Sequence, residues 1–383
     1  MKVDIVIIGA GMAGAAAAFH LASAHSNTDS RGGERMILLE GEAQPGYHST
    51  GRSAALYEPC LGNATVRAFN VASAKFLNFP PAGFADRPLM SRRGELTIAD
   101  ETRRDDLDQV LALDGLGGHE IREIAAGQAR AMIPILRPDQ IRWAAYEPDV
   151  MDMDVHAIHQ GFLKGFAARG GRLLRDVAVR GIERRPGRWR IEAGAESFEA
   201  DIVVNAAGAW ADDVAVLAGL APLDLQPKRR TAAILPAPEG LDIHGWPAFG
   251  VAGEHGYFKP EAGKLLVSPG DATPVPPQDV QPEELDIAHL VDWFESRTTL
   301  TVRRVERRWA GLRTFAPDNS PVLGEDPAAP GFWWLAGQGG YGIMMAESLA
   351  RSLAGLMLRG ALPEDVRALG VDSAAIDPRR LRG

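Results

Sequence analysis

The feature that most constrains this chain is a glycine-rich turn between an apolar run and an alanine-rich segment near the N-terminus. Residues 3–8 are mostly β-branched and apolar, Gly9, Gly11 and Gly14 follow, and residues 15–24 are rich in alanine. This order predicts a buried strand, a tight turn and a helix. The first glycine of such a turn permits the bend, the second lets a pyrophosphate approach the backbone, and the third lets the helix pack on the strand. The chain is therefore expected to contain a dinucleotide-binding unit.

An acidic residue follows the next predicted strand, as this kind of unit requires. Residues 36–39 are apolar and precede Glu40, which lies 31 residues after Gly9. The usual separation is about 20 residues, and we attribute the excess to a polar surface loop inserted at 26–35. A carboxylate in this position can accept hydrogen bonds from the hydroxyls of a ribose.

The remaining sequence predicts an α/β protein with two interleaved domains. A length of 383 residues exceeds that of a typical single domain. A buried strand at 201–204 returns to the nucleotide-binding pattern, whereas Pro-rich turns and alternating segments elsewhere favour an antiparallel sheet. We predict a discontinuous Rossmann-like nucleotide-binding domain at 1–85, 142–225 and 322–383. An α+β substrate domain on a mostly antiparallel sheet is predicted at 86–141 and 226–321.

Composition excludes several classes of function. The net charge is −9 and the basic clusters are short, so nucleic acid is not an expected partner. Cys60 is the only cysteine, which excludes internal disulfides, an all-cysteine zinc cluster and an iron–sulfur centre, and no metal is expected. No apolar run approaches the ~20 residues of a membrane span, and the N-terminus leaves no room for a cleavable signal. We expect a cytoplasmic protein.

Three further segments decide between the dinucleotides that share this fingerprint. Residues 49–54 offer hydroxyls, a glycine and a cation soon after the acidic strand, Gly208 follows the strand at 201–204, and residues 336–343 open a helix whose N-terminus can stabilise negative charge. The predicted cofactor residues in these segments are Ser49, Thr50, Arg52, Ser53, Ala54, Gly208, Gly337, Gly339, Gly340, Tyr341, Gly342 and Ile343.

The order of these segments resembles that of the D-amino-acid-oxidase superfamily of FAD-dependent oxidoreductases. The resemblance implies FAD as the cofactor. Cys60 does not match the C-terminal attachment point of sarcosine oxidases, so the FAD is expected to be noncovalent. No second glycine fingerprint follows another strand, so electrons are expected to enter from a small-molecule substrate.

Longer stretches resemble the bacterial D-arginine dehydrogenases, among them residues 44–55, 225–230, 309–313 and 338–343. By this resemblance, the substrate carboxylate is held by Arg230, Arg313 and Tyr257. The α-amine binds the carbonyl of Gly340, and Glu95 pairs with a distal cation of the substrate. A guanidinium suits a carboxylate because its planar fork donates two hydrogen bonds.

The side-chain end of the implied pocket departs from that family. Leu56 and Leu61 stand where the family has a His and a Tyr, and Glu58 replaces another pocket residue. Two carboxylates favour a cationic substrate, whereas the two leucines favour an apolar or shorter one. His48 is interpreted as structural or cofactor-side, and the segment 245–256 as an active-site lid.

The implied reaction is oxidative deamination of a D-amino acid to a 2-oxo acid and ammonia by hydride transfer from Cα to flavin N5. The electron acceptor stays open between a quinone, a dye and oxygen, and the oligomeric state is also open. One alternative is a glycine- or sarcosine-type flavin amine oxidase that uses oxygen. The other is a flavin-binding regulatory protein without activity.

Overall fold

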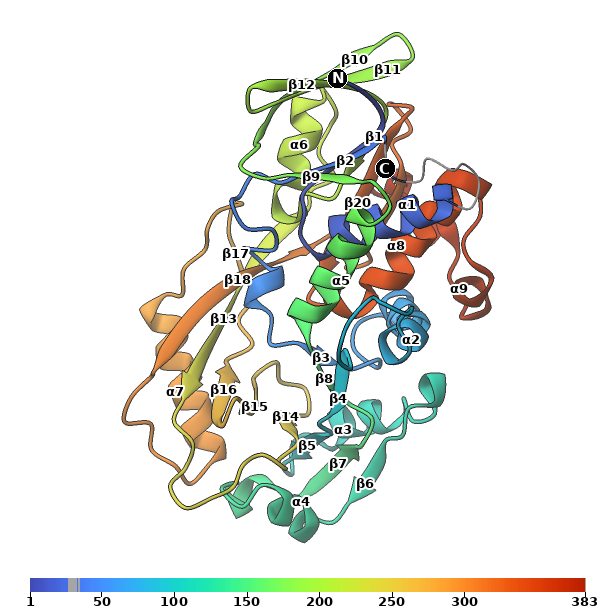
Figure 1. The fold of residues 1–383 in the computed structure, drawn as a ribbon. Helices are drawn as coiled ribbons and strands as arrows, with labels where there is room; N and C mark the ends of the chain where they lie inside the picture. Colours follow the sequence, from blue (N-terminus) through green and yellow to red (C-terminus); the bar gives the residue numbers. More distant parts are fainter. Residues whose placement is uncertain (27–32, 34, 383) are drawn as a thin grey trace.

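The computed structural model describes residues 1–26, 33 and 35–382. Two large sheets organise the chain, one in the upper and one in the lower half of Figure 1. Most of the predicted inserted loop at 26–35 lies outside the described residues. Both chain ends lie near the first sheet.

The first sheet carries the nucleotide-binding pattern. Its order is β10-β11-β12-β1-β2-β9, with β20 paired to β12 and β19 to β20. β1 is parallel to both β12 and β2, and β20 is parallel to β12. The apolar run predicted at 3–8 forms β1, which is buried along most of its length because neighbours cover both faces. The strands are β1 (Lys2–Ile8), β2 (Met36–Leu39), β9 (Arg172–Leu174), β10 (Val179–Arg185), β11 (Arg188–Ala193), β12 (Glu196–Asn205), β19 (Val322–Glu325) and β20 (Phe332–Ala336).

Helices pack on both faces of this sheet. The alanine-rich segment forms α1, whose small side chains allow close contact with the sheet and with α5 and α8. Figure 1 shows α1, α5 and α8 grouped beside β1 and β20. α6 packs against the other face with β10 and β12. These helices are α1 (Met12–Ser26), α2 (Ala64–Asn78), α5 (Val155–Ala167), α6 (Ala211–Leu217), α8 (Gly342–Arg359) and α9 (Glu364–Ala368).

The second sheet is mostly antiparallel and has the order β21-β18-β13-β16-β15-β14-β5-β7-β6, with β17 on β13. α7 and α4 cover its core, and α3 packs on β5 and β7. Its strands are β5 (Glu95–Ala99), β6 (Arg122–Ile124), β7 (Trp143–Glu147), β13 (Gln226–Leu235), β14 (Ala248–Val251), β15 (Tyr257–Glu261), β16 (Lys264–Ser268), β17 (Thr273–Pro274), β18 (Arg307–Phe315) and β21 (Gln338–Gly339). The helices are α3 (Arg104–Leu111), α4 (Ala126–Met132) and α7 (Glu284–Arg297).

The second sheet extends past the predicted domain boundaries. β7 belongs to it although the boundary at 142 assigns these residues to the nucleotide-binding domain, because β7 pairs antiparallel with β5 and β6. β21 likewise pairs with β18. A third sheet, β3 (Leu56–Tyr57), β8 (Met151–Met153) and β4 (Met90–Arg92), lies between the two. The helix α5 therefore begins at Val155, directly after β8.

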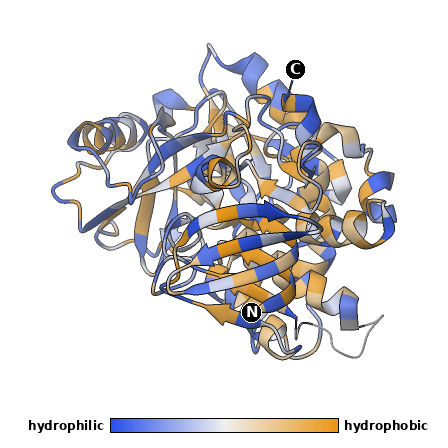
Figure 2. Cartoon of the chain, turned by 90° about the horizontal axis from the view of Figure 1, so that it is seen from above, coloured by the Kyte–Doolittle hydropathy of each residue, from blue (hydrophilic) through white to orange (hydrophobic). Residues whose placement is uncertain are grey.

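Hydropathy follows this layering. The strands around the N-terminus alternate between hydrophilic and hydrophobic residues in Figure 2, as β11 does in its burial pattern. Such alternation is typical of a sheet with one face on a core and one in water. Across residues 1–26 and 35–382, no helix has the length and apolar character needed to cross a membrane.

Candidate active site

The glycine-rich turn between β1 and α1 forms one wall of a large cavity. Gly9 has φ +97°, and a Cβ built there would lie 2.6 Å from the Ala206 carbonyl oxygen on β12's exit. A Cβ on Gly14 would lie 1.8 Å from the Gly9 carbonyl oxygen, so α1 can approach the turn only with glycine at that position. Gly11 instead faces the cavity and meets only Thr50, at 3.4 Å.

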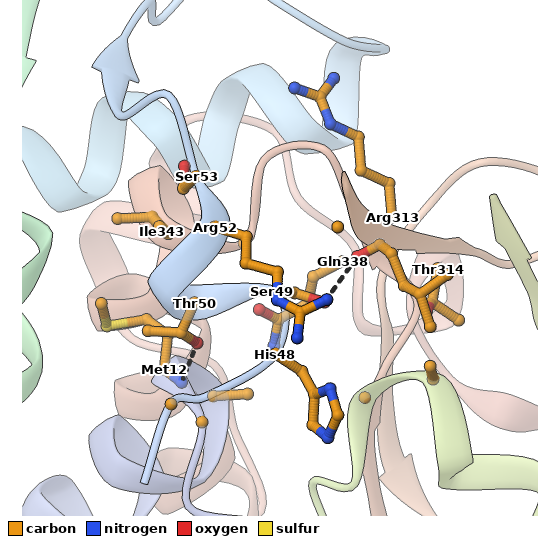
Figure 3. Close-up of a pocket in the computed structure, with 18 of the residues that line it drawn as sticks. Met12, His48, Ser49, Thr50, Arg52, Ser53, Arg313, Thr314, Gln338 and Ile343 are labelled. Atoms are coloured by element: carbon orange, nitrogen blue, oxygen red, sulfur yellow. Dashed lines mark hydrogen bonds between the residues drawn. The ribbon is translucent and has the colours of Figure 1, made fainter. Parts of the chain in front are cut away.

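Glu40 and Thr50 are fixed at the same wall by backbone amides. The two Glu40 oxygens accept hydrogen bonds from the amides of Ala10 at 2.9 Å and Glu42 at 3.0 Å. Thr50 Oγ1 accepts a hydrogen bond from the amide of Met12, at 3.0 Å, in the first turn of α1 (Figure 3). Both side chains line the cavity. Their positions therefore depend on the turn that the fingerprint encodes.

Arg52 was predicted to face a pyrophosphate, but its guanidinium contacts the second sheet's domain. It lines the cavity, donates to the carbonyls of Val280 at 2.9 Å and Ala310 at 3.0 Å, and pairs with Asp279. Ser49 Oγ donates to the Leu312 carbonyl at 2.6 Å. The segment 49–54 thus ties the nucleotide-binding domain to β18. Ser53 and Ala54 also line the cavity.

The C-terminal motif supplies the facing wall. Gly208, Gly337, Gly339, Gly340, Gly342 and Ile343 line the cavity, and Tyr341 is the N-cap residue of α8. The helix starts at Gly342, within the segment 336–343 predicted to open it, and Gln338 and Gly339 before it pair with β18. The Gln338 amide nitrogen is buried and has no hydrogen-bond partner among the described residues.

These walls fit an FAD molecule. The cavity holds about 1310 Å³ of empty space, part of it open to solvent. It combines glycines that allow close approach, the N-termini of α1 and α8, and the unpartnered amide of Gln338. Helix N-termini favour anionic groups because their amides point outward. The residues present therefore provide the donors and the space that a dinucleotide needs.

Arg230 and Arg313 reach the same cavity from the second sheet. They lie on the paired strands β13 and β18, where Arg230 is opposite Gly311. Neither guanidinium has an ion pair or hydrogen bond with any described residue. Burial, then the neighbouring Arg313, lowers the pKa of Arg230 to about 10. Figure 3 shows Arg313 at the opposite side of the pocket from Met12. Tyr257 on β15 completes this end of the cavity.

Gly340 lies directly against the guanidinium of Arg313. A Cβ on Gly340 would lie 2.8 Å from Arg313 Nη1, so a larger residue would displace the arginine. The structure therefore brings together Arg230, Arg313, Tyr257 and Gly340, four of the five predicted substrate residues, at one end of the cavity.

Glu95 lies beside the cavity rather than on its wall. It opposes Glu147 directly in the β5–β7 register. Burial, then Glu58 and Glu147, raises the pKa of Glu95 well above its ordinary value. Burial and Glu147 likewise raise the pKa of Glu58, against the effect of Arg313. Neither the Glu58 nor the Glu95 carboxylate has a hydrogen-bond partner in the described part of the chain.

Sequence reasoning missed Glu147, His119 and Gln338. His119 Nε2 and Glu147 Oε2 are 2.9 Å apart and both side chains are buried. The position of Glu147 follows from the pairing of β7 with β5, and no local sequence motif predicts that pairing. Gln338, however, stands within the glycine motif, and its polar side chain between small residues was a signal that could have been used.

The segment 245–256, predicted as a lid, and His48 both pack against other parts of the protein. Ala248–Val251 is strand β14 between β5 and β15, so the middle of the segment 245–256 belongs to the sheet. Arg93 fixes the residues before it by donating to the carbonyls of His244 and Trp246. His48 Nε2 lies 2.9 Å from Glu42 Oε1, and its ring contacts Trp210.

Comparison with known proteins shows the family of the chain. The family model described as FAD dependent oxidoreductase (DAO) matches residues 4–356. Glycine oxidase of Bacillus licheniformis is 25% identical over 371 residues, covering 93% of each chain. Mouse mitochondrial sarcosine dehydrogenase is 23% identical over 72% of this chain, and rat mitochondrial dimethylglycine dehydrogenase 24% over 95%. The chain matches only 31% and 44% of the length of these two relatives.

Solved structures share the fold. L-proline dehydrogenase from P. horikoshii superposes with a TM-score of 0.79 at 22% identity, covering 100% of this chain and 98% of the other. L-α-glycerophosphate oxidase from Mycoplasma pneumoniae, solved with FAD bound, gives a TM-score of 0.81 at 17% identity, covering 93% and 95%. At these identities the likeness shows the architecture alone.

Proposed function

The chain belongs to the DAO family of FAD-dependent oxidoreductases, and we propose that it oxidises the α-carbon of an amino acid whose carboxylate binds between Arg230 and Arg313. The observation that carries this proposal is the pair of guanidiniums at one end of the cavity, without a carboxylate partner among the described residues. Two neighbouring buried cations repel each other, and burial is costly for an unpaired charge. An anionic ligand that accepts from both relieves the repulsion and the desolvation cost.

The protein's part in the reaction is orientation. Arg230 and Arg313 hold the carboxylate, the Tyr257 hydroxyl can donate to it, and the Gly340 carbonyl can accept from the α-amine. With both groups held, rotation about Cα is restricted and the α-hydrogen has a fixed direction. FAD supplies the redox chemistry by accepting the two electrons and the hydrogen as a hydride. The oxidised substrate then takes up water and gives a 2-oxo acid and ammonia.

The finer proposal is a D-amino acid with a basic side chain, of the D-arginine or D-lysine kind. It rests on the segments that resemble D-arginine dehydrogenases and on the carboxylates of Glu58 and Glu95. These carboxylates lie near Arg230 and Arg313, which together we call the carboxylate clamp. A distal ammonium or guanidinium would compensate these unpartnered carboxylates. Leu56 and Leu61 argue in the other direction, because they favour an apolar or shorter side chain.

A glycine- or sarcosine-type amine oxidation is the second candidate, favoured by the names of the relatives described above. It would use the same carboxylate clamp without engaging Glu95. A flavin-binding protein without activity is a weaker candidate, because it gives no reason for two unpaired guanidiniums at the cavity.

The deciding experiment is anaerobic mixing of the purified flavoprotein with D- and L-amino acids, glycine and sarcosine while flavin absorbance is followed. Rapid bleaching by D-arginine or D-lysine supports the finer proposal. Bleaching by glycine or sarcosine alone supports the second candidate, and no bleaching by any of these compounds contradicts both. An oxygen electrode beside a dye-reduction assay then distinguishes an oxidase from a dehydrogenase with a quinone-like acceptor.

A further inference from the structure

Three potential metal ligands of different chemistry lie close together near the carboxylates of Glu58 and Glu95. Cys60 Sγ, His119 Nε2 and a Glu147 carboxylate oxygen all lie within 4.8 Å of one another. They come from distant parts of the chain: the turn after β3, the end of the 3₁₀ turn at Leu116–Gly118, and the end of β7. His119 and Glu147 are 5% and 7% exposed, so the position of both ligand atoms is set by packing.

The spacing of these atoms suits a small divalent ion. Zinc binds thiolate sulfur at about 2.3 Å, imidazole nitrogen at about 2.0–2.1 Å and carboxylate oxygen at about 2.0–2.2 Å. At tetrahedral angles these bonds place the ligand atoms roughly 3.3–3.6 Å apart. The pair of His119 Nε2 and Glu147 Oε2 is closer than this, at 2.9 Å, and the three atoms together lie within 4.8 Å of one another. Side-chain rotations would therefore have to separate His119 from Glu147 to admit an ion between the three atoms.

The charge around the three atoms favours a cation independently. Glu147 opposes Glu95 across the β5–β7 pair, and like charges directly opposite in a sheet destabilise it. Glu58 is the third carboxylate of the group, two residues before Cys60. Neither Glu58 nor Glu95 forms an ion pair with a cation in the described ranges. Cys60 Sγ also has no hydrogen bond there, so its sulfur is free to coordinate.

One of the three residues also lies at a second cavity. His119 is on the wall of this cavity, whose lining is separate from that of the FAD cavity. Asp149 and Tyr57 lie on the same wall, whereas Cys60 and Glu147 are not among its lining residues.

We propose that Cys60, His119 and Glu147 form a binding site for a zinc-class divalent cation, with a fourth position open to water or another ligand. The mixture of sulfur, nitrogen and oxygen ligands selects zinc or cobalt over magnesium and calcium, which prefer oxygen alone. A bound ion would neutralise part of the negative charge of the neighbouring Glu58 and Glu95 carboxylates. The three ligands are independent of the proposed reaction, since none of them is assigned a part in substrate binding.

The test is zinc binding to the intact flavoprotein after treatment with a chelator. We expect about one Zn²⁺ per chain by elemental analysis after dialysis, and an affinity reduced at least tenfold in Cys60→Ser, His119→Gln and Glu147→Gln. His244→Gln is the matched control, because His244 is an exposed histidine paired with Asp242, and its zinc affinity should equal that of the wild type.

Cobalt provides a readout of the sulfur ligand. Co²⁺ should add a thiolate charge-transfer band to the absorption of the flavoprotein, and Cys60→Ser should abolish this band without altering FAD content. Cys60→Ser replaces only the sulfur atom by oxygen, so it keeps the test decisive even if His119→Gln or Glu147→Gln fails to fold. Absence of stoichiometric zinc, or equal zinc affinity in Cys60→Ser and the wild type, would overturn the proposal.

Discussion

Replacing Arg313 by alanine removes one of the two guanidiniums from the end of the cavity. A charged partner of a buried carboxylate is typically worth about 2–5 kcal/mol when it is truncated. We expect the lower part of this range, about 2–3 kcal/mol, because Arg230 remains beside the carboxylate as a second charged partner. This free energy corresponds to a roughly 30- to 150-fold loss in kcat/KM. The thermal stability of the ligand-free protein should change little, since the variant loses the repulsion with Arg230 and also the attraction to the Glu58 carboxylate.

Two measurements check this expectation. Anaerobic stopped-flow reduction gives kcat/KM for the substrate, and titration with a 2-oxo acid, followed through the flavin absorbance, gives the affinity for a carboxylate without an amine. Lys228→Ala is the matched control, since Lys228 is a cation opposite Arg313 on the neighbouring strand β13 and lies over the ring of Phe315, and it should change neither value. An Arg313→Ala enzyme with near wild-type values in both measurements would show that the two guanidiniums do not form the carboxylate site.

Three further expectations concern other parts of the chain. FAD should be released intact by acid precipitation, and flavin retained on the precipitate would contradict noncovalent binding. Glu95→Gln should lower kcat/KM for D-arginine and D-lysine by ~1–3 kcal/mol and affect D-alanine far less, whereas a uniform loss indicates a structural carboxylate. Burial, with Arg351 and Arg169, lowers the pKa of His20 to about 3. Because the unfolded chain takes up this proton near pH 6.5, the free energy of unfolding should fall below pH 6.5 by up to ~1.4 kcal/mol per pH unit. Denaturant titrations should show a shallower fall in His20→Leu.

The sequence predicts the cofactor half of the molecule well because its structure is local. A β-branched run, three spaced glycines and an alanine-rich stretch can be satisfied together only by a strand, a turn and a helix. The steric limits at Gly9 and Gly14 explain the spacing, since a Cβ at either position would collide with backbone atoms. The carboxylate at Glu40 follows from the same unit. These features therefore identify a dinucleotide-binding unit before any tertiary contact is known.

The substrate half is less predictable because its residues meet through strand pairing. Glu95 and Glu147 are 52 positions apart, and only the register of β5 and β7 places them opposite each other. The sequence contains no local pattern for that register. The boundary predicted at 142 failed for the same reason, since a short alternating strand such as β7 can join either sheet.

Arg52 shows that a local motif can predict which segment lines the cavity without predicting which groups a side chain in that segment contacts. A cation between hydroxyl residues next to a dinucleotide fold favours a phosphate contact, and Arg52 does line the FAD cavity. Its guanidinium, however, donates to Val280 and Ala310 and pairs with Asp279, all in the substrate domain. The segment that approaches the cofactor is thereby anchored to β18, the strand that carries Arg313. A change in the position of β18 would move Arg313 and the cofactor segment together, so the proposed carboxylate site would keep its position relative to the FAD cavity.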